Sequence, residues 1–406
     1  MSTTLSGRIK AKAALVDPSR YGRSDRSQLG RWFWEIDRVL LLLVAVLIGI
    51  GLIAVAAASP AAGQRYSGGS VQISGLYFFY KQIAWIAVGL PVMIGISMLT
   101  RDRARRLSLF GAAFFFVLMI FVPVLGPEIN GATRWIELPV GQLQPSEFLK
   151  PFFVVAMAWL LSLREKDKSL PVFAISALVT GGIAFLLMQQ PDFGSTIIFG
   201  CVWIAMLALA GVSLRALGGL ALAGLVGIVL AYFFYDVATT RIDGFLFGEG
   251  DTFQTDNAMR TLTAGGLFGM GPGGGTRKFG LPEPHTDYIF LVIGEEFGLI
   301  ACLAIALLYL GIVVRVLVKL LDEDSTFAIL AAAGLAIQFG LQAIINMAVN
   351  VQIAPSKGMT LPFISYGGSS MLALSVGMGL LLAFTRRNPY LTRSPYVVKW
   401  SGDHSQ

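Results

Sequence analysis

The chain has 406 residues and a formal net charge of +7, and 55% of its residues are hydrophobic while only 14% are charged. Soluble domains usually carry about a quarter charged residues, so this composition excludes an ordinary soluble protein and indicates an integral membrane protein. The two cysteines, Cys201 and Cys302, lie in apolar runs. They show neither the spacing of a metal site nor that of a disulfide framework.

Ten apolar runs, each long enough to cross a bilayer as a helix, follow one another along the chain. They fall at about 39–59, 78–99, 107–125, 147–163, 170–188, 193–212, 216–235, 287–314, 327–353 and 364–385. We therefore predict an all-α integral membrane protein of about ten transmembrane helices. The predicted membrane domain covers residues 39–387, between a basic tail at 1–38 and a second tail at 388–406.

Basic residues gather on every second connection and in the N-terminal tail, as in "RDRARR" (101–106) and "REKDK" (164–168). That side of the predicted bundle holds 22 of the 31 Lys and Arg residues. The positive-inside rule then predicts that both termini are cytoplasmic. The positive charge is thus a topology signal, and no nucleic-acid partner is expected.

The longest predicted outer loop, 236–286, joins spans seven and eight and contains "GGLFGMGPGGGTRKFG" (265–280). The stretch lacks the G-x-x-x-x-G-K-[ST] pattern of a phosphate-binding loop, and it faces away from cytoplasmic nucleotides. We interpret it as a flexible hinge.

Polar residues collect at the outer ends of the spans, whereas the inner ends carry only basic flanks. An ionisable side chain at membrane depth costs about 2.5–3.5 kcal/mol on insertion scales, so each one is a candidate functional residue. The asymmetry predicts a site on the outer face. Its blocks are "NGATRWIEL" (130–138), "QPSEFLK" (144–150), "QQPDFGS" (189–195), "HTDYIF" (285–290) and "APSKGMTLPFISYGGSS" (354–370).

Several of these residues have a structural alternative. Glu147 and Lys150 are three residues apart and could pair on one helix face instead of binding substrate. Asp192 could cap the sixth span. Arg134 has no carboxylate nearby in the sequence, which suits a pyrophosphate or another anion. The small residues around Ser369 could serve close helix packing alone.

Asp287 is the sharpest candidate, because it lies beside His285 where the long loop meets the eighth span. Glu295 follows eight residues later, about 80° around a helix, so the two carboxylates could line one cavity while Glu296 faces elsewhere. A buried carboxylate with a raised pKa can act as a general base. The alternative is an aspartate that caps the helix.

Five blocks, "GATRWI", "QPSEFLK", "QPDFGS", "PEPHTDYIFLVIGEEFG" and "LPFISYGGSS", occur in the order found in the SEDS family of cell-wall glycosyltransferases. The chain resembles that family over nearly its whole length, and its division member more than its elongation member. The resemblance implies a ten-helix bundle that polymerises lipid II, the undecaprenyl-pyrophosphate-linked disaccharide pentapeptide, into β-1,4 glycan outside the cytoplasmic membrane. It also implies a class B penicillin-binding protein and other divisome membrane proteins as partners.

The resemblance implies roles for particular residues as well. Asp287 matches the family's essential aspartate, Glu147 and Lys150 match its essential Glu and Lys, and Lys357 and Ser369 lie in the block before the last span. Asp287 is then the base, and Arg134 and Lys150 meet the pyrophosphate, with a divalent cation such as Mg²⁺ or Mn²⁺ as a further partner. Some division members carry a glutamate where this chain has Phe279, so a role assigned to that glutamate does not transfer.

Two other classes of function stay open. A lipid II flippase or transporter would also place polar residues in spans, although the inner halves of these spans are nearly all apolar. A membrane scaffold for division proteins is compatible with either activity, because both tails could recruit partners.

Overall fold

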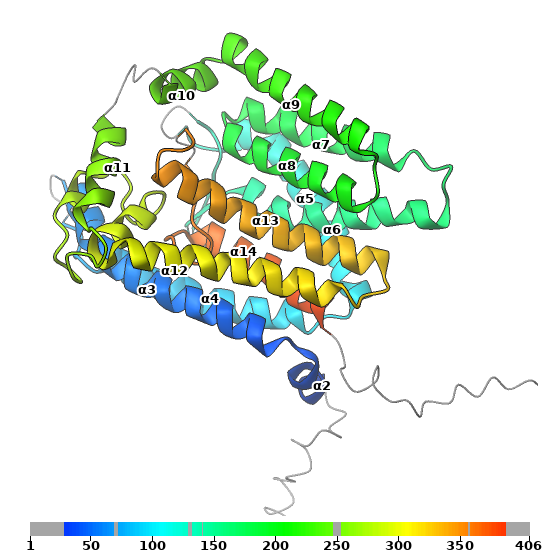
Figure 1. Cartoon of the computed structure of the whole chain (residues 1–406), viewed down its shortest axis with the longest axis horizontal. Helices are drawn as coiled ribbons and strands as arrows, with labels where there is room; N and C mark the ends of the chain where they lie inside the picture. The colour runs from blue at the N-terminus through cyan, green and yellow to red at the C-terminus, as the bar shows by residue number, and fades with distance from the viewer. Residues whose placement is uncertain are drawn as a thin grey trace, which may run out of the picture.

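The computed structural model describes residues 28–68, 72–128, 132–139, 141–246, 253–355 and 358–386. Lys357, most of the N-terminal tail and the C-terminal tail lie outside these ranges. Each of the ten predicted spans lies on a helix of one bundle (Figure 1). These helices are α3 (Arg38–Tyr66), α4 (Tyr77–Ser97), α5 (Arg101–Leu125), α6 (Pro145–Lys166), α7 (Val172–Gln189), α8 (Phe193–Leu209), α9 (Leu214–Phe234), α12 (Ile289–Leu320), α13 (Thr326–Asn350) and α14 (Gly368–Thr385).

Within the described residues, nine of these helices are long and apolar enough to cross a membrane, and α8, with 17 residues, is slightly shorter. Short polar side chains begin several of them. Asp37, Thr100, Asp192, Ser213 and Ser325 each accept a backbone N–H in the first turn of the helix that follows. Such caps satisfy amides that a helix start leaves unpaired. The predicted cap at Asp192 is therefore present.

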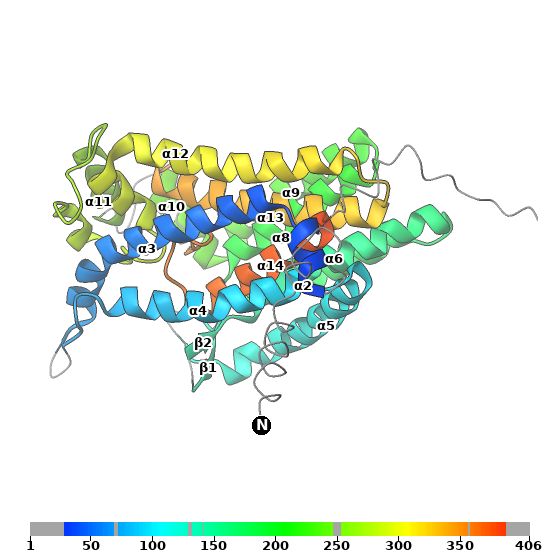
Figure 2. The same cartoon turned by 90° about the horizontal axis from the view of Figure 1, so that it is seen from below.

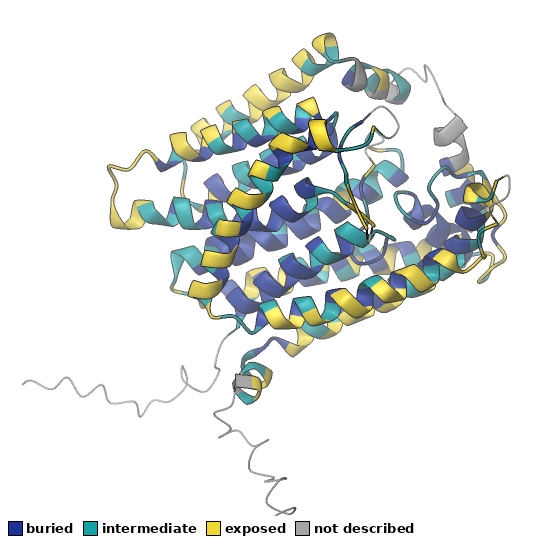
Figure 3. Ribbon diagram, turned by 180° about the vertical axis from the view of Figure 1, so that it is seen from behind, coloured by how far each residue is buried: buried dark blue, intermediate teal, exposed yellow. Residues whose placement is uncertain are grey.

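The centre of the bundle is formed by α6, α13 and α14, whose residues are mostly buried (Figure 3). At the periphery, α9 has no buried residue at all. An apolar helix with an exposed surface is what a membrane protein presents to lipid.

The two ends of the bundle differ in character. At one end, called here the basic end, lie the short helix α2 (Gln28–Glu35) and the starts or ends of α3, α5, α12 and α14. The opposite loop end carries α10 (Asp236–Leu246), α11 (Phe253–Ala264), the 3₁₀ turn η2 (Arg277–Gly280) and an antiparallel hairpin (Figure 2). The hairpin pairs β1 (Ile136–Leu138) with β2 (Gly141–Leu143).

The predicted hinge at 265–280 is packed rather than loose. Met270 N–H donates to Glu295 O (2.9 Å), and Leu299 N–H donates to Gly266 O (3.0 Å). This backbone pairing runs along a break in α12, where Gly298 has φ 82° and ψ 176°. The glycines allow close approach: a Cβ on Gly269 would lie 2.2 Å from Glu296 O. We therefore correct the hinge interpretation: Gly265, Gly269 and Gly275 allow close contact with α12.

Candidate active site

Asp287 lies in the turn that precedes α12, and the backbone of this turn is held from two sides. Asn350 and Asn346 of α13 donate from Nδ2 to Asp287 O at 2.9 and 3.2 Å. From the 358–366 segment, Ser365 Oγ donates to Thr286 O (2.6 Å) and Tyr366 N–H donates to His285 O (2.9 Å). Three successive carbonyl groups are therefore fixed, which fixes the direction in which the Asp287 side chain leaves the backbone.

The Asp287 carboxylate does not serve as the helix cap. The N-cap position of α12 is Tyr288, and no side chain caps this helix. Asp287 is half-buried, and a Cβ on Gly358 would lie 3.3 Å from Asp287 Oδ2. The carboxylate thus faces the segment that also contains the "LPFISYGG" block.

Sequence reasoning missed the amide row on α13. Gln338, Gln342, Asn346 and Asn350 follow at intervals of four residues and are all buried. Gln342 Nε2 donates to Thr360 O (3.2 Å) and Asn346 Nδ2 to Met359 O (2.5 Å). Residues four apart share one helix face, so repeated amides in an apolar span were the signal that could have revealed this row.

Glu147 and Lys150 form the ion pair that the sequence left as an alternative. Lys150 Nζ lies 2.5 Å from Glu147 Oε1, and the side chains are 2% and 12% exposed. Glu147 also lines a small cavity between α6, α13 and α14, together with Gln338 and Gln342. The Glu147–Lys150 pair therefore lies next to the row of buried amides on α13.

Arg134 is bound to backbone carbonyl groups. Its side chain is buried, and it donates from Nε to Gln190 O (3.1 Å) and from Nη2 to Pro191 O. These carbonyls belong to the turn between α7 and α8, where Pro191 has a φ of 26°. The anion partner expected for Arg134 stays a prediction, and the structure adds two backbone carbonyl partners, which side-chain patterns do not reveal.

His285 is packed between aromatic rings. Its ring centroid lies 4.1 Å from that of Phe78 and 5.3 Å from that of Tyr366. Burial lowers the pKa of His285 to about 4, so the imidazole is neutral near pH 7. Glu283, four residues before Asp287, accepts the hydroxyl of Tyr66 at 2.6 Å. The surroundings of His285 therefore consist of uncharged rings and the carboxylate of Glu283, which is already hydrogen-bonded to Tyr66.

Glu295 and Glu296 both hold the glycine-rich stretch. Glu295 accepts the N–H groups of Arg277 (2.7 Å) and Lys278 (2.9 Å), whereas Glu296 accepts Gly273 N–H (3.0 Å) and pairs with Lys278 Nζ. Both carboxylates are almost fully buried. The expectation that Glu295 shares a cavity with Asp287 while Glu296 faces elsewhere is corrected: both carboxylates bind this stretch, because the stretch packs along α12.

The last predicted positions lie near α14. Ser369 is half-buried in the first turn of that helix, and its neighbour Ser370 is hydrogen-bonded to Thr360 with 2.7 Å between the hydroxyl oxygens. Lys357 falls outside the described residues. Among the residues that are described, no three His, Cys, Asp or Glu side chains are grouped as a metal site.

The chain is similar to known proteins over most of its length. The family model for FtsW, RodA and SpoVE, described as a cell cycle protein, matches residues 38–390. "Probable peptidoglycan glycosyltransferase FtsW" of Caulobacter vibrioides is 39% identical over 371 residues, covering 91% of this chain and 94% of the relative. The protein of the same name from Alkalilimnicola ehrlichii is 35% identical over 381 residues, with the same two shares covered.

Solved structures agree with these relatives. A chain from a structure described as "Structural coordination of polymerization and crosslinking by a peptidoglycan synthase complex" is 26% identical, with a TM-score of 0.71, and the match covers 86% of this chain and 97% of that chain. The crystal structure of rod shape determining protein RodA from Thermus thermophilus is 26% identical, with a TM-score of 0.63, over 86% of this chain and 96% of that chain.

Proposed function

The chain belongs to the FtsW, RodA and SpoVE family and is an FtsW-type peptidoglycan glycosyltransferase of the membrane, and we propose that it polymerises lipid II with Asp287 as general base. The observation that carries the proposal is the turn around Asp287. Contacts from α13 and from the 358–366 segment fix its backbone, while the carboxylate is not used as the helix cap.

The reaction inverts the anomeric centre by direct attack of a hydroxyl group, and a base is required because that hydroxyl must lose its proton. The sugar of lipid II is α-linked to pyrophosphate and the product is β-1,4-linked, so a hydroxyl group must attack from the opposite face. In the proposed step, Asp287 takes the proton of the attacking 4-hydroxyl while the new glycosidic bond forms. The bond to pyrophosphate breaks, and the pyrophosphate leaves with the electron pair. A positioned base accounts for about 10²–10⁴-fold of rate in such reactions.

The leaving pyrophosphate needs cationic partners. Arg134 is bound to carbonyls and Lys150 to Glu147, so both are assigned here to holding the site rather than to meeting the anion directly. We assign that contact to Lys357, which the resemblance places in the "APSKGMTLPFISYGGSS" block (354–370). A divalent cation, Mg²⁺ or Mn²⁺, would be held by phosphate oxygens and one or two carboxylates.

The proposed orientation puts the loop end outside the cytoplasmic membrane and both tails, 1–38 and 388–406, in the cytoplasm. The excess of Lys and Arg at the basic end supports this orientation. The outer loop 236–286 then faces a class B penicillin-binding protein, which we propose as the transpeptidase partner in septal wall synthesis. The similarity to a chain from a peptidoglycan synthase complex supports such a partner.

The test is polymerisation of purified lipid II by the purified protein, alone and with its cognate transpeptidase. Asp287→Asn keeps shape and hydrogen-bonding capacity but removes the base, so we expect product formation to fall about 10²–10⁴-fold. Asp167→Asn, an exposed carboxylate at the basic end, is the matched control and should polymerise normally. Near-normal glycan synthesis by Asp287→Asn would refute the assigned role. Transport of lipid II without polymerisation by the unmodified protein would favour the flippase alternative.

A further inference from the structure

The short helix α2 is attached to the basic end of the bundle, directly before α3 (Figure 1). Trp32 Nε1 donates to Ser97 Oγ at the end of α4 (2.8 Å), and Glu35 pairs with Arg386 after α14 (3.3 Å). One side of α2 is therefore fixed against two helices that lie far from it in the sequence.

The other side of α2 is apolar and exposed. Leu29 and Phe33 are 65% and 50% exposed, and their spacing of four residues places them on one face. The guanidinium carbon of Arg38 lies 4.4 Å from the ring centroid of Phe33 and 4.8 Å from that of Trp34. An apolar stripe bordered by aromatic rings and a cation is typical of a helix that lies in a membrane interface.

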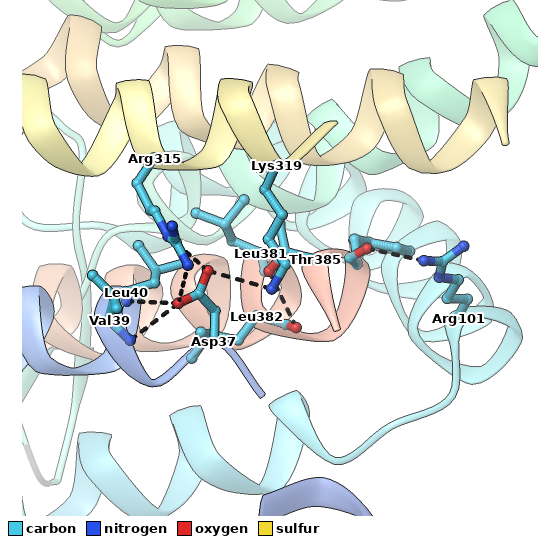
Figure 4. Close-up of polar contacts among 10 residues, drawn as sticks. Asp37, Val39, Leu40, Arg101, Arg315, Lys319, Leu381, Leu382 and Thr385 are labelled. Carbon is cyan, nitrogen blue, oxygen red and sulfur yellow. Dashed lines mark hydrogen bonds and ion pairs between the residues drawn. The ribbon is translucent and has the colours of Figure 1, made fainter. Parts of the chain in front are cut away.

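Asp37 ties the joint between α2 and α3 to α12. Asp37 is buried and accepts the N–H groups of Val39 and Leu40, and its Oδ2 also lies 3.0 Å from Arg315 Nε and 3.3 Å from Lys319 Nζ of α12 (Figure 4). These contacts hold α2 at the level where the first apolar span begins. Leu29 and Phe33 therefore lie within ten residues of the start of the first apolar span.

The charge of this segment indicates what covers the exposed face. The first 38 residues contain eight Lys and Arg and four Asp and Glu residues. Two of these acids, Glu35 and Asp37, are paired within the bundle. The remaining excess is cationic, and juxtamembrane cations attract anionic phospholipids.

We propose that α2 is an interfacial helix that binds anionic phospholipid headgroups, with Leu29 and Phe33 seated at the acyl boundary. A protein partner fits less well. Two exposed side chains on an eight-residue helix fall far short of the roughly 800 Å² per partner that a specific protein interface buries. The lipid function is separate from the proposed catalytic role of Asp287, which lies at the loop end.

The test uses the full-length protein in lipid nanodiscs, in a Cys201→Ser background. An environment-sensitive fluorophore is attached to the cysteine of Leu29→Cys. The apolar ring of the fluorophore replaces the volume of the removed leucine side chain. The matched control is Ser169→Cys, an exposed position in the connection after α6 at the same end. Lipids with a nitroxide near the headgroup should quench the label at position 29 about twofold more than at 169. Phosphatidylglycerol should increase this quenching, and salt should reduce it.

A second variant keeps the proposal falsifiable if the label itself perturbs α2. Phe33→Gln should reduce the quenching at position 29 about twofold without changing that at 169. Equal quenching at the two labelled positions would overturn the proposal, and so would quenching that is independent of phosphatidylglycerol. Shielding of position 29 that arises only on adding the cognate transpeptidase would assign this face to a protein instead.

Discussion

Asn350 links a buried amide to the backbone of the proposed base. Its Nδ2 donates to Asp287 O, and Asn350 is only 1% exposed. Asn350→Ala should lower the polymerisation rate about 10–100-fold with little change in KM, because a displaced catalytic group costs rate rather than binding. Gln338→Ala, from the same buried row but without contact to the Asp287 turn, is the control. Equal losses in the two variants would mean that the row matters only for stability.

His285 gives the molecule a titratable group whose pKa differs between the folded and unfolded states. The folded value of about 4 lies below the unfolded value of about 6.5, so the unfolded chain binds more protons between these pH values. The contribution of His285 is complete above pH 6.5 and is lost as the pH falls toward 4. At pH 5 the loss should be about 2 kcal/mol.

Thermal unfolding in detergent from pH 7 to pH 5 measures this effect. The midpoint of unmodified protein should fall across that interval, whereas that of His285→Gln, which cannot titrate there, should change less. Parallel curves for the two proteins would show that other groups carry the acid sensitivity.

At the scale of single elements, apolar run length was a sufficient guide. All ten predicted spans became helices, because about 20 apolar residues have no other low-energy structure in a bilayer. The partners of polar side chains were harder to foresee. Arg134 binds two carbonyl groups and Glu295 binds two N–H groups. Backbone groups are present at every residue, so a sequence pattern cannot indicate which of them a side chain will meet.

The glycine-rich stretch makes the same point for a whole segment. Glycine permits both flexibility and close contact, and only the folded packing against α12 distinguishes them. Gly269 and Gly266 both have positive φ, 82° and 55°, but a Cβ would clash at 269 and meets nothing within 4 Å at 266.

This difference yields a matched pair of variants. Gly266→Ala should cost about 1–2 kcal/mol from backbone conformation alone, whereas Gly269→Ala should cost more, because the new Cβ must displace Glu296 from the stretch. The thermal unfolding midpoints of the two purified variants show which of them is less stable. A stability for Gly269→Ala equal to that of Gly266→Ala would contradict close packing at this position.

At the scale of the whole molecule, the bundle separates two kinds of chemistry at its two ends. Ion pairs such as Arg101–Glu323 (2.9 Å) and Arg315–Asp37 (3.0 Å) tie helices together at the basic end. The proposed base and the packed glycine-rich stretch lie at the loop end. Because α3 and α12 each run from one end to the other, a single orientation in the membrane decides which side receives the substrate.

Accessibility of cysteines tests that orientation in intact cells. In a Cys201→Ser background, Pro272→Cys at the loop end should react with an impermeant thiol reagent added outside, because this position is exposed. Arg103→Cys at the basic end is equally exposed, but it should react only after the membrane is opened. The expectation rests on the Lys and Arg excess, which retains the basic end in the cytoplasm. Labelling of position 103 in intact spheroplasts would place Asp287 on the cytoplasmic side, where a polymerase of exported lipid II could not act.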